Sequence, residues 1–351
     1  MPSPLDSAFV KGSAIEAGFH EVGVARAEPL DPAPLDRILA AGAEADMDWL
    51  AAQRAQRLDP AKVLPGARSV IVVALSHAVP EGTSPAAGFG EVARYARGRD
   101  YHTVMKRRLA ALSTRLRERD PAASLFASCD VAPVMEKAWA QRAGLGWVGK
   151  NGCFITTRHG SWVVLGTILV DRELQPDSPS LERCGGCALC IPACPTGAIP
   201  EPGFVDARRC LSFWTIERRG AVPGEIAGRL GSWVFGCDDC QTACPWNRPK
   251  VATAEVDLVP RPGQRALAIL DLLRMTEEEY RRRFNGTALA RARYDGLVRN
   301  ACLVAAQGCG SAELAALQAL TESPFQGVRE AARWALGRGH CPTSAGSRRI
   351  P

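Results

Sequence analysis

The sequence predicts a multidomain protein that combines the α/β and α+β classes, and three changes of pattern along its 351 residues indicate where the domains divide. Over residues 1–175, segments with the pattern of strands alternate with amphipathic helices, which is typical of helices packed around one sheet. Residues 176–250 are rich in cysteine and poor in apolar periodicity, so apolar side chains alone do not build their core. Residues 251–351 repeat alanine and leucine at helical spacing, which predicts a helical tail.

The first segment contains the best-defined elements. Residues 69–76 form a continuous apolar run with the length of a buried strand, and residues 5–26 have the pattern of an amphipathic helix that leads into a short strand. Two apolar runs at 153–157 and 162–170 flank Gly160, a spacing that predicts a β-hairpin. Helical periodicity predicts further helices at 35–54, 101–119 and 132–144.

The tail is predicted to be helical throughout. Residues 267–284 have the pattern of one helix, and Thr276 and Glu279 have the spacing of a capping box within it. Amphipathic stretches separated by Gly or Pro follow, and they resemble one HEAT-like repeat preceded by a partial one. Such repeats are stable only in longer stacks, so we expect the tail to pack on the rest of the protein.

Two cysteine runs give the strongest chemical signal in the chain. One has the spacing C-x2-C-x2-C-x3-C-P and the other C-x2-C-x3-C-P, with Cys210 between them. Thiolates at these spacings are ligands of [4Fe–4S] clusters, and the last cysteine of such a run usually binds the other cluster. Paired CxxC motifs also bind zinc, but two interlocked runs that end in Cys-Pro fit two clusters better. The rule predicts one cluster on Cys184, Cys187, Cys190 and Cys244, and a second on Cys194, Cys210, Cys237 and Cys240.

Composition and charge indicate the class of protein and the cellular compartment to expect. A hydrophobic content of 46% suits a globular protein, and the longest apolar runs, 69–75 and 162–170, are too short to cross a membrane. The start of the chain shows neither a signal peptide nor a twin-arginine motif, and the net charge of +6 is compatible with a polyanionic partner. We expect a reducing, cytoplasmic location, because five further cysteines are scattered and odd in number: Cys129, Cys153, Cys302, Cys309 and Cys341.

The segment that precedes the cysteine runs indicates more than an electron carrier. Residues 1–175 are enough to hold a second cofactor or a substrate. They contain neither the glycine pattern of a dinucleotide fold nor that of a P-loop. The glycine-rich segment 144–152 has two interpretations, either a helix end followed by a strand or a backbone that closely approaches a large flat ligand.

Several segments together resemble one enzyme family. RLDPAKVLPGARSVIVVAL at 57–75, YARGRDYHTVMKRRL at 95–109 and CDVAPVMEKAWAQRAGLGWVGKN at 129–151 accompany the two cysteine runs and the helical tail. This combination covers nearly the whole chain and resembles the epoxyqueuosine reductases. The resemblance implies cobalamin, two [4Fe–4S] clusters, and a first domain with the fold of cobalamin-dependent reductive dehalogenases. It also implies the reduction of epoxyqueuosine to queuosine at the wobble position of tRNA, the last step of queuosine biosynthesis.

The resemblance implies that Asp130 is the proton donor. Loss of an epoxide oxygen as water takes two electrons and two protons, so an acid must lie near the departing oxygen. A buried carboxyl beside a flat cofactor is expected to have a raised pKa, which suits an acid at neutral pH. From the sequence alone, Asp130 could instead cap a helix that begins near Val131.

Matching positions also imply residues that contact the corrin. Ser212 and Asp238 lie beside cysteines of the second cluster, which the resemblance places nearer to the cobalamin. Arg57 and Phe154 are further candidates, since a guanidinium suits the amides and phosphate at the edge of cobalamin, although a solvated charge at a helix end is the alternative for Arg57. His102 either lines the pocket or is structural. The motif Asp-x-His-x-x-Gly is missing from the sequence, so we do not expect a histidine-ligated cobalamin.

Basic residues indicate where tRNA could bind. They gather in three places, and aromatic side chains lie among them. Charge runs are often only solvated faces, but a phosphate backbone is bound by such residues, and a splayed base stacks on aromatic side chains. We expect tRNA contacts from Arg219, Arg281, Arg282, Arg283 and Arg293, with Arg291 and Arg299 in the same basic run.

Partners and alternatives follow from these motifs. The resemblance implies tRNAs that accept aspartate, asparagine, histidine or tyrosine, and an electron donor such as a flavodoxin or a ferredoxin. We expect a monomer because the substrate is large. A cytosolic reductive dehalogenase would share the cofactors, but the basic tail and the lack of a twin-arginine motif in the sequence argue against it. An electron-transfer protein that serves another enzyme would share only the clusters.

Overall fold

The computed structural model describes residues 5–80, 86–248, 252–308 and 310–338. The chain forms two compact units, and each is assembled from three stretches of the sequence. The first unit comprises Met1–Glu81, Arg94–Arg208 and Asp238–Val259. The second unit comprises Gly82–Ala93, Arg209–Cys237 and Pro260–Pro351.

A four-stranded antiparallel sheet forms the centre of the first unit, with the strand order β1-β2-β7-β4. β2 lies between β1 and β7, so both of its edges are hydrogen-bonded, and every one of its residues is buried. The continuous apolar run predicted this strand correctly, because a strand covered on both faces carries apolar side chains on both. The strands are β1 (Glu21–Arg26), β2 (Ser69–Ser76), β4 (Leu125–Ser128) and β7 (Val163–Val170).

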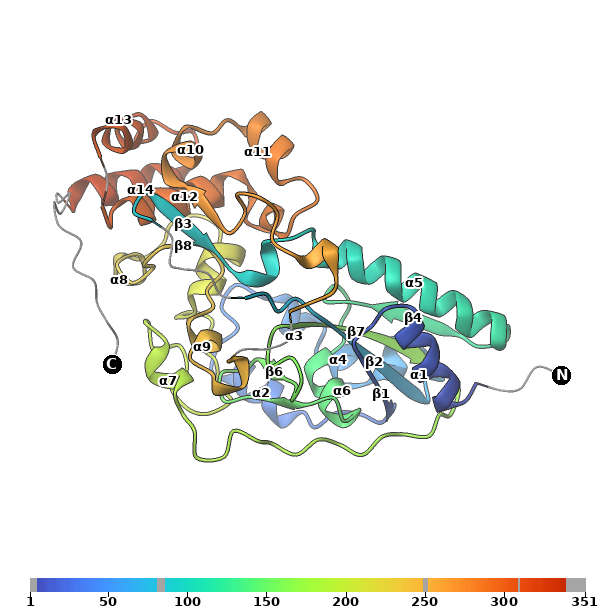
Figure 1. Ribbon diagram of the computed structural model, residues 1–351. Helices are drawn as coiled ribbons and strands as arrows, with labels where there is room; N and C mark the ends of the chain where they lie inside the picture. The colour runs from blue at the N-terminus through green and yellow to red at the C-terminus, as the bar shows by residue number, and fades with distance from the viewer. Residues whose placement is uncertain (1–4, 81–85, 249–251, 309, 339–351) are drawn as a thin grey trace. The chain divides into compact units, whose positions relative to one another are not determined.

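Helices cover both faces of this sheet (Figure 1). Ile71, Val73 and Leu75 belong to the core shared with α1 and α5, and the alternate residues of β2 belong to the core shared with α2 and α6. α5 has the bounds that its periodicity predicted, and Asp100 caps it by accepting a hydrogen bond from the His102 backbone N–H. The helices are α1 (Ser7–Glu16), α2 (Ala33–Ala40), α5 (Tyr101–Arg119) and α6 (Glu136–Arg142).

The β-hairpin predicted around Gly160 is wrong. β7 pairs with both β2 and β4, so it has no free edge for the strand that precedes it. That strand, β6 (Phe154–Ile155), pairs instead with β5 (Trp147–Val148). Across the turn there is a single antiparallel bridge, between Thr156 and Gly160.

Two predicted helices of the first unit have other bounds in the structure. The helix predicted at 35–54 is divided into α2, α3 (Trp49–Ala52) and α4 (Arg54–Leu58). It is interrupted where Gly42 and Ala45 have positive φ angles of 58° and 55°, a conformation that no α-helix contains. The helix predicted at 132–144 begins only at Glu136, because the residues before it form bends.

A second, smaller sheet belongs to the second unit and has the order β8-β3-β9. β3 (Phe89–Val92) runs parallel to β8 (Trp233–Phe235) and antiparallel to β9 (Ala266–Ala268). β9 and the short helix α10 (Ile269–Arg274) replace the first part of the single helix predicted at 267–284. That prediction is therefore wrong in its first part, because β9 uses its backbone groups to pair with β3.

Helices make up the rest of the second unit (Figure 1). α11 begins with the predicted capping box, in which Thr276 and Glu279 satisfy each other's backbone N–H groups. α12 is the central helix, since it packs against α10 and α14 and is buried from Gly296 to Ala305. The helices are α11 (Glu277–Phe284), α12 (Arg293–Ala305), α13 (Ser311–Leu320) and α14 (Gln326–Gly337).

Arg299 holds together the irregular part of the second unit. Its guanidinium, only 2% exposed, donates hydrogen bonds to the carbonyls of Trp214, Arg218 and Gly220, at 2.6 to 2.9 Å. These carbonyls lie within and just after a π-helical turn, Phe213–Glu217. The expectation that Arg299 belongs to an exposed basic run is therefore wrong, because the residue is a buried structural ion.

The remaining elements are short. Among the described residues, no helix is both long and apolar enough to cross a membrane. No disulfide joins cysteines of the described ranges, and Cys309 and Cys341 lie outside those ranges. The short helices are α7 (Cys190–Ala193), α8 (Gly224–Ala227) and α9 (Asp239–Thr242), and the 3₁₀ turns are Pro60–Lys62, Arg94–Ala96, Pro245–Asn247, Val256–Leu258 and Ala288–Ala292.

Candidate active site and cluster-binding site

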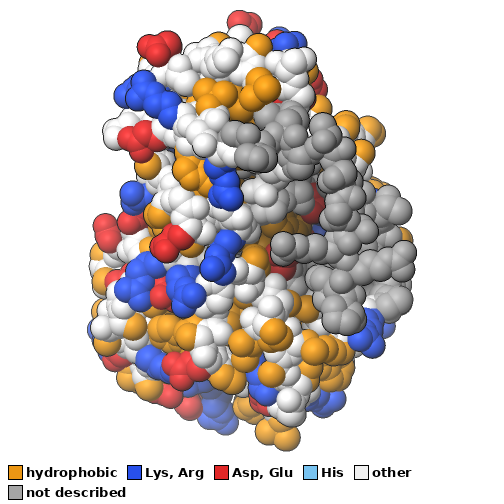
Figure 2. Space-filling model, turned by 90° about the vertical axis from the view of Figure 1, so that its left-hand side faces the viewer, with side chains coloured by type: hydrophobic (Ala, Val, Ile, Leu, Met, Phe, Trp, Pro, Cys, Tyr) orange, Lys and Arg blue, Asp and Glu red, His pale blue; other side chains and the backbone are white. Residues whose placement is uncertain are grey.

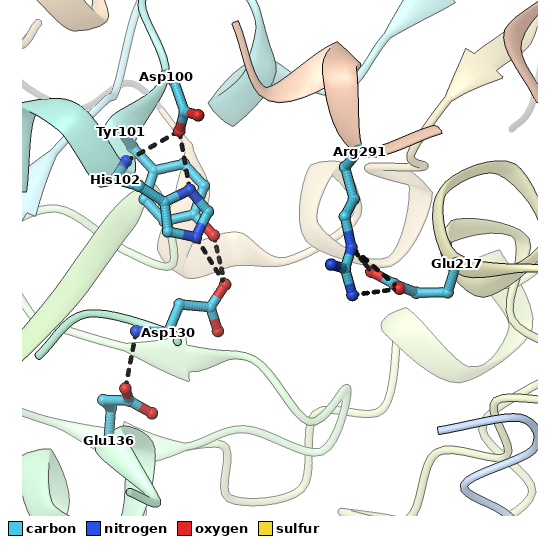
Figure 3. A network of polar contacts seen from close by, with 7 residues as sticks. All are labelled: Asp100, Tyr101, His102, Asp130, Glu136, Glu217 and Arg291. Carbon is cyan, nitrogen blue, oxygen red and sulfur yellow. Dashed lines mark hydrogen bonds and ion pairs between the residues drawn. The ribbon is translucent and has the colours of Figure 1, made fainter. Parts of the chain in front are cut away.

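Asp130 stands at the centre of a polar network in the first unit, which we call the Asp130 site (Figure 3). The Tyr101 hydroxyl donates a short hydrogen bond to Oδ2 of Asp130, and His102 Nε2 lies 3.6 Å from the same oxygen. The backbone N–H of Asp130 donates to Oε1 of Glu136 at 2.9 Å. Asp100 completes the site, with its Oδ1 2.8 Å from His102 Nδ1.

The backbone of Asp130 is held in an unfavourable conformation. Its φ angle is 60°, in the left-handed region that residues with a side chain seldom adopt. The anchors come from two elements, Tyr101 and His102 from the start of α5 and Glu136 from the start of α6. Strain of this kind persists only where neighbouring groups fix it, and it is common at functional sites.

His102 carries the positive charge of this site. Although burial alone favours the neutral ring, hydrogen bonds with Asp100 and Asp130 raise the pKa of His102 to about 9. The ring also stacks on Tyr101, with 4.0 Å between the ring centroids. His102 is therefore a cation at neutral pH, and it lies between two carboxylates.

The expected raised pKa of Asp130 is wrong. The surrounding protein favours the neutral acid, but hydrogen bonds from His102 and Tyr101 outweigh this and hold the pKa of Asp130 below its usual value. The alternative role as a helix cap is also wrong, because α6 begins after Met135 and no side chain caps it. Asp130 is thus a carboxylate in this structure, with its side chain 63% exposed.

Glu136 is the acid of this site with the raised pKa. Burial raises the pKa of Glu136 to about 7, even though it accepts the Asp130 N–H. Arg57, a predicted corrin contact, lies close enough to interact electrostatically with Glu136 and Asp130. Its Nη2 donates to Gln53 at 3.0 Å, but its buried Nε has no hydrogen-bond partner among the described residues. A partly buried guanidinium with an unused donor suits a polar ligand better than a solvated helix end.

The other predicted corrin contacts lie in different surroundings. Asp238 is buried in the first unit, where its Oδ2 accepts the Arg94 backbone N–H at 2.8 Å. Burial raises the pKa of Asp238 to about 6 despite the nearby charges of Arg97 and Arg94. Phe154 is 4% exposed and packs in the core beneath the four-stranded sheet, and Ser212 belongs to the second unit.

One predicted set of cluster ligands surrounds a single cavity in the first unit. The cavity has a volume of about 110 Å³, and we call it the cysteine cavity. Lys150, Asn151, Ile155, Pro245 and Trp246 complete its wall. Four sulfurs around one hollow is the arrangement that a four-iron cube requires. The structure therefore brings together Cys184, Cys187, Cys190 and Cys244.

The second predicted set is divided between the two units. Cys194 and Cys240 belong to the first unit, and Cys210 and Cys237 belong to the second. The sulfur of Cys194 accepts a hydrogen bond from the Ala198 backbone N–H at 3.2 Å. Cys153, which the spacing rule left out, forms a hydrogen bond with Cys240 that lowers the pKa of its thiol. Spacing does not reveal this cysteine, because it lies outside both runs.

The arginines predicted to contact tRNA differ in their exposure and in whether an acidic side chain pairs with them. Arg281 pairs with Glu277 at 2.8 Å, while Arg282 and Arg283 are exposed and line a surface cavity of about 550 Å³ together with Arg274. Arg293 is exposed at the start of α12. The Arg219 guanidinium is half-buried and donates to the carbonyls of residues 216, 291 and 292. Figure 3 also draws the neighbouring Arg291, which forms a bidentate ion pair with Glu217.

The cysteines of the cysteine cavity, and Asp130, lie in segments that match two known protein families. Residues 183–247 match the family described as a 4Fe-4S double cluster binding domain, so the chain is an iron–sulfur protein with two clusters. This match confirms the two-cluster prediction and contradicts the zinc alternative. Residues 57–130 match the family described as Epoxyqueuosine reductase QueG, DUF1730.

Whole-chain relatives identify the family. An epoxyqueuosine reductase of Gloeobacter violaceus is 44% identical over 303 residues, which are 84% of this chain and 94% of that protein. Those of Pseudomonas aeruginosa and Escherichia coli are 40% and 37% identical, over 96% and 86% of this chain and 96% and 82% of their own lengths. The chain belongs to the epoxyqueuosine reductase family, and it is an oxidoreductase.

Solved structures of the family have the same fold. A selenomethionine-labelled epoxyqueuosine reductase is 28% identical with a TM-score of 0.85, over 94% of this chain and 89% of that one. An epoxyqueuosine reductase with an epoxyqueuosine-modified tRNA-Tyr stem loop gives a TM-score of 0.86 at 28% identity, over 94% and 88% of the two chains. The Bacillus subtilis enzyme, described with its catalytic aspartate loop swung out of the active site, gives 0.83 at 28% identity, over 94% and 89%.

Proposed function

We propose that this protein reduces epoxyqueuosine to queuosine at the wobble position of tRNA, and that Asp130 delivers a proton to the departing oxygen. The observation that carries the proposal is the Asp130 site, in which an exposed carboxylate is fixed beside a protonated histidine. Membership of the epoxyqueuosine reductase family supplies the substrate. The same membership disfavours a dehalogenase and a plain electron carrier.

The chemistry of the reaction explains why such a site is needed. Two electrons and two protons convert the epoxide into an alkene and water, as both carbon–oxygen bonds of the ring break. Iron–sulfur clusters pass electrons one at a time, and cobalamin, when bound, supplies a low-potential metal centre to the substrate. The protein must therefore supply position and protons.

The arrangement of Asp130 and His102 suggests how a proton is supplied. Asp130 is ionised at rest, whereas His102 is protonated at neutral pH and lies 3.6 Å from Asp130 Oδ2. We infer that His102 Nε2 passes its proton through Asp130 to the departing oxygen as negative charge develops there, and that solvent at the exposed Asp130 supplies the second proton. Asp100, at His102 Nδ1, holds the ring in orientation for this transfer.

The residues present suit a cobalamin. The unpartnered Arg57 Nε is a donor for the polar edge of the corrin, close to Asp130. We propose the same role for Ser212, Asp238 and Phe154, and a first domain with the reductive-dehalogenase fold. We propose that these four residues and Asp130 form the cofactor-binding site.

The two clusters would then pass electrons in one direction. We propose that electrons arrive at the cysteine cavity, where Cys187 is exposed, from an external donor such as a flavodoxin or a ferredoxin. They would leave toward the cobalamin from the second cluster. Its proposed ligands are Cys194, Cys210, Cys237 and Cys240.

The basic tail is the proposed tRNA-binding region, and we assign it a HEAT-like arrangement of α12, α13 and α14. On the face shown in Figure 2, Lys and Arg side chains recur but are interspersed with acidic ones. We therefore expect tRNA to bind at local clusters of basic side chains and not over a whole face. The freest cluster is that of Arg282 and Arg283. The other proposed contacts are Arg219, Arg281 and Arg293, and the proposed substrates are the tRNAs that accept aspartate, asparagine, histidine or tyrosine.

Replacing Asp130 with Asn tests the proposal. The amide keeps the size of the side chain but cannot pass a proton, so turnover of epoxyqueuosine tRNA should be lost while the absorbance of clusters and corrin is unchanged. Nucleosides released from the digested tRNA would report the product. Normal turnover by this variant would contradict the role of Asp130. Turnover of a chlorinated phenol but not of the tRNA would instead favour a dehalogenase.

A further inference from the structure

The glycine-rich segment 144–152 lies against the cysteine cavity. Trp147, in β5, is 1% exposed, and its indole Nε1 donates a hydrogen bond to the sulfur of Cys184 at 3.4 Å. This distance is in the range of a hydrogen bond to sulfur. The indole ring also meets the edge of Trp246, with 4.9 Å between the ring centroids. A residue of the first predicted domain thus contacts a predicted cluster ligand directly.

Other residues of the same segment hold the cysteine loops in place. Lys150 Nζ donates to the carbonyl of Gly185 at 2.6 Å, and Asn151 Nδ2 donates to the carbonyl of Cys240 at 3.4 Å. A side chain at Gly146 would collide with the Ile155 carbonyl, so β5 can approach β6 closely only with glycine there. The segment ends a helix at Gly144, as one of its two interpretations predicted, and its close approach is to the cysteine loops and β6.

We propose that Trp147 tunes the cluster held in the cysteine cavity. Adding an electron to a cluster increases the negative charge on its sulfurs, and a hydrogen bond to a ligand sulfur stabilises that charge. The Trp147 N–H therefore raises the reduction potential of this cluster, which favours acceptance of an electron from the external donor. The buried ring of Trp147 and the partly buried ring of Trp246 also pack against Cys184 and Cys244. The inference rests on the proposed assignment of Cys184 to a cluster.

Replacing Trp147 with Phe removes the N–H and keeps an aromatic ring. In the full-length protein reconstituted anaerobically with iron and sulfide, a redox titration followed by EPR should show two one-electron waves. The wave of the cluster in the cysteine cavity should move to lower potential in the variant, and the other wave should stay in place. Trp139, equally buried at 1% exposure but packed in the core beside the four-stranded sheet, gives the matched control, since Trp139→Phe should move neither wave.

Each outcome separates the inference from the proposed function. A variant that keeps its full iron content with both potentials unmoved would overturn the role of Trp147. Failure of the unmodified protein to hold two clusters would instead overturn the proposed ligand assignment. If Trp147→Phe does not retain iron, the unmodified protein labelled with indole-15N tryptophan tests the hydrogen bond instead. ENDOR of its reduced cluster should show coupling to an indole nitrogen. The same coupling should remain in Trp246→Phe, which keeps Trp147. Absence of that coupling would also overturn the inference.

Discussion

The Asp130 site and the cysteine cavity lie in the same unit but are stabilised in opposite ways. At the Asp130 site, charged groups surround an exposed carboxylate on a left-handed backbone. Around the cysteine cavity, Trp147, Trp246 and Ile155 pack beside Cys184 and Cys244, and the neutral indole N–H of Trp147 donates to the sulfur of Cys184. A proton donor must meet solvent and substrate, whereas the cysteine cavity is apolar on the side of Trp147 and Ile155 and open at the exposed Cys187. One unit thus separates proton chemistry from electron chemistry by local polarity.

The largest expected effect comes from breaking the cysteine cavity. Cys244→Ser removes one of its four sulfurs, and we expect the loss of one cluster and of turnover with it. Iron analysis should fall from about eight to about four atoms per chain, the content of two and of one [4Fe–4S] clusters.

Cys302→Ser is the matched control for that variant. Cys302 is also a buried free thiol, but it lies in α12 of the second unit, outside the predicted ligand sets. Its replacement should leave the iron content unchanged. Full iron and full activity in Cys244→Ser would contradict the assignment of the cavity.

A smaller effect is expected at the Asp130 site, where chemistry depends on position. Glu136→Ala removes the acceptor of the Asp130 N–H, so the strained loop loses one of its anchors. We expect kcat to fall by about a hundredfold, the usual cost of misplacing a reacting group by an ångström, while the iron content stays the same. Single-turnover assays with excess enzyme would measure this directly.

Glu136→Gln separates position from charge. The amide oxygen still accepts the Asp130 N–H, so this variant should retain activity within a few-fold of the unmodified protein. Equal losses in Glu136→Ala and Glu136→Gln would show that the charge of Glu136 matters, and not its hydrogen bond.

In the basic tail, arginines with no ion pair among the described residues can be compared with one that is paired. Reversing Arg282 and Arg283 to Glu should weaken tRNA binding about tenfold or more at physiological salt, because two phosphate-binding cations become anions. The same reversal of Arg281 alone should cost less, since Glu277 already neutralises part of its charge. Filter binding at several salt concentrations would measure both. Unchanged affinity in the double variant would place the tRNA elsewhere.

Residue patterns predicted the fold best where one interaction decides the structure. β2 and α5 were predicted at their observed bounds, because a doubly covered strand and an amphipathic helix each have a clear period. The hairpin around Gly160 was wrong because pairing with distant strands, which no local pattern shows, used both edges of β7. The helix predicted at 267–284 was wrong in its first part for the same reason.

At the site, chemistry was easier to predict than environment. Cysteine spacing predicted the set around the cysteine cavity because a cluster needs that spacing. The pKa of Asp130 was predicted with the wrong sign, because its partners Tyr101 and His102 come from another part of the chain. Trp147 was missed since a tryptophan carries no motif of its own, although it lies in a segment already noted for its glycines.

The smallest expected effect is a pH dependence of stability at the Asp130 site. The pKa of His102 is about 9 in the folded protein against 6.5 for an unperturbed histidine, so the folded state binds the proton more tightly. Its contribution to the free energy of unfolding is present in full below pH 6.5 and is lost as the pH rises through 9. The side chain is 37% exposed, so we expect less than about 1 kcal/mol. The melting temperatures of the unmodified protein and of His102→Gln should therefore converge between pH 6.5 and 9.5.

His77 gives the opposite case in the same unit. Burial lowers the pKa of His77 to about 3, so this residue is neutral in the folded protein across the whole of that pH range. Its proton uptake on unfolding destabilises the protein only as the pH falls below 6.5. The difference in melting temperature between the unmodified protein and His77→Gln should thus stay constant between pH 7.5 and 9.5, while that of His102→Gln shrinks. Parallel behaviour of the two variants would mean that His102 is not held as a cation, and the proposed proton supply to Asp130 would lose its source.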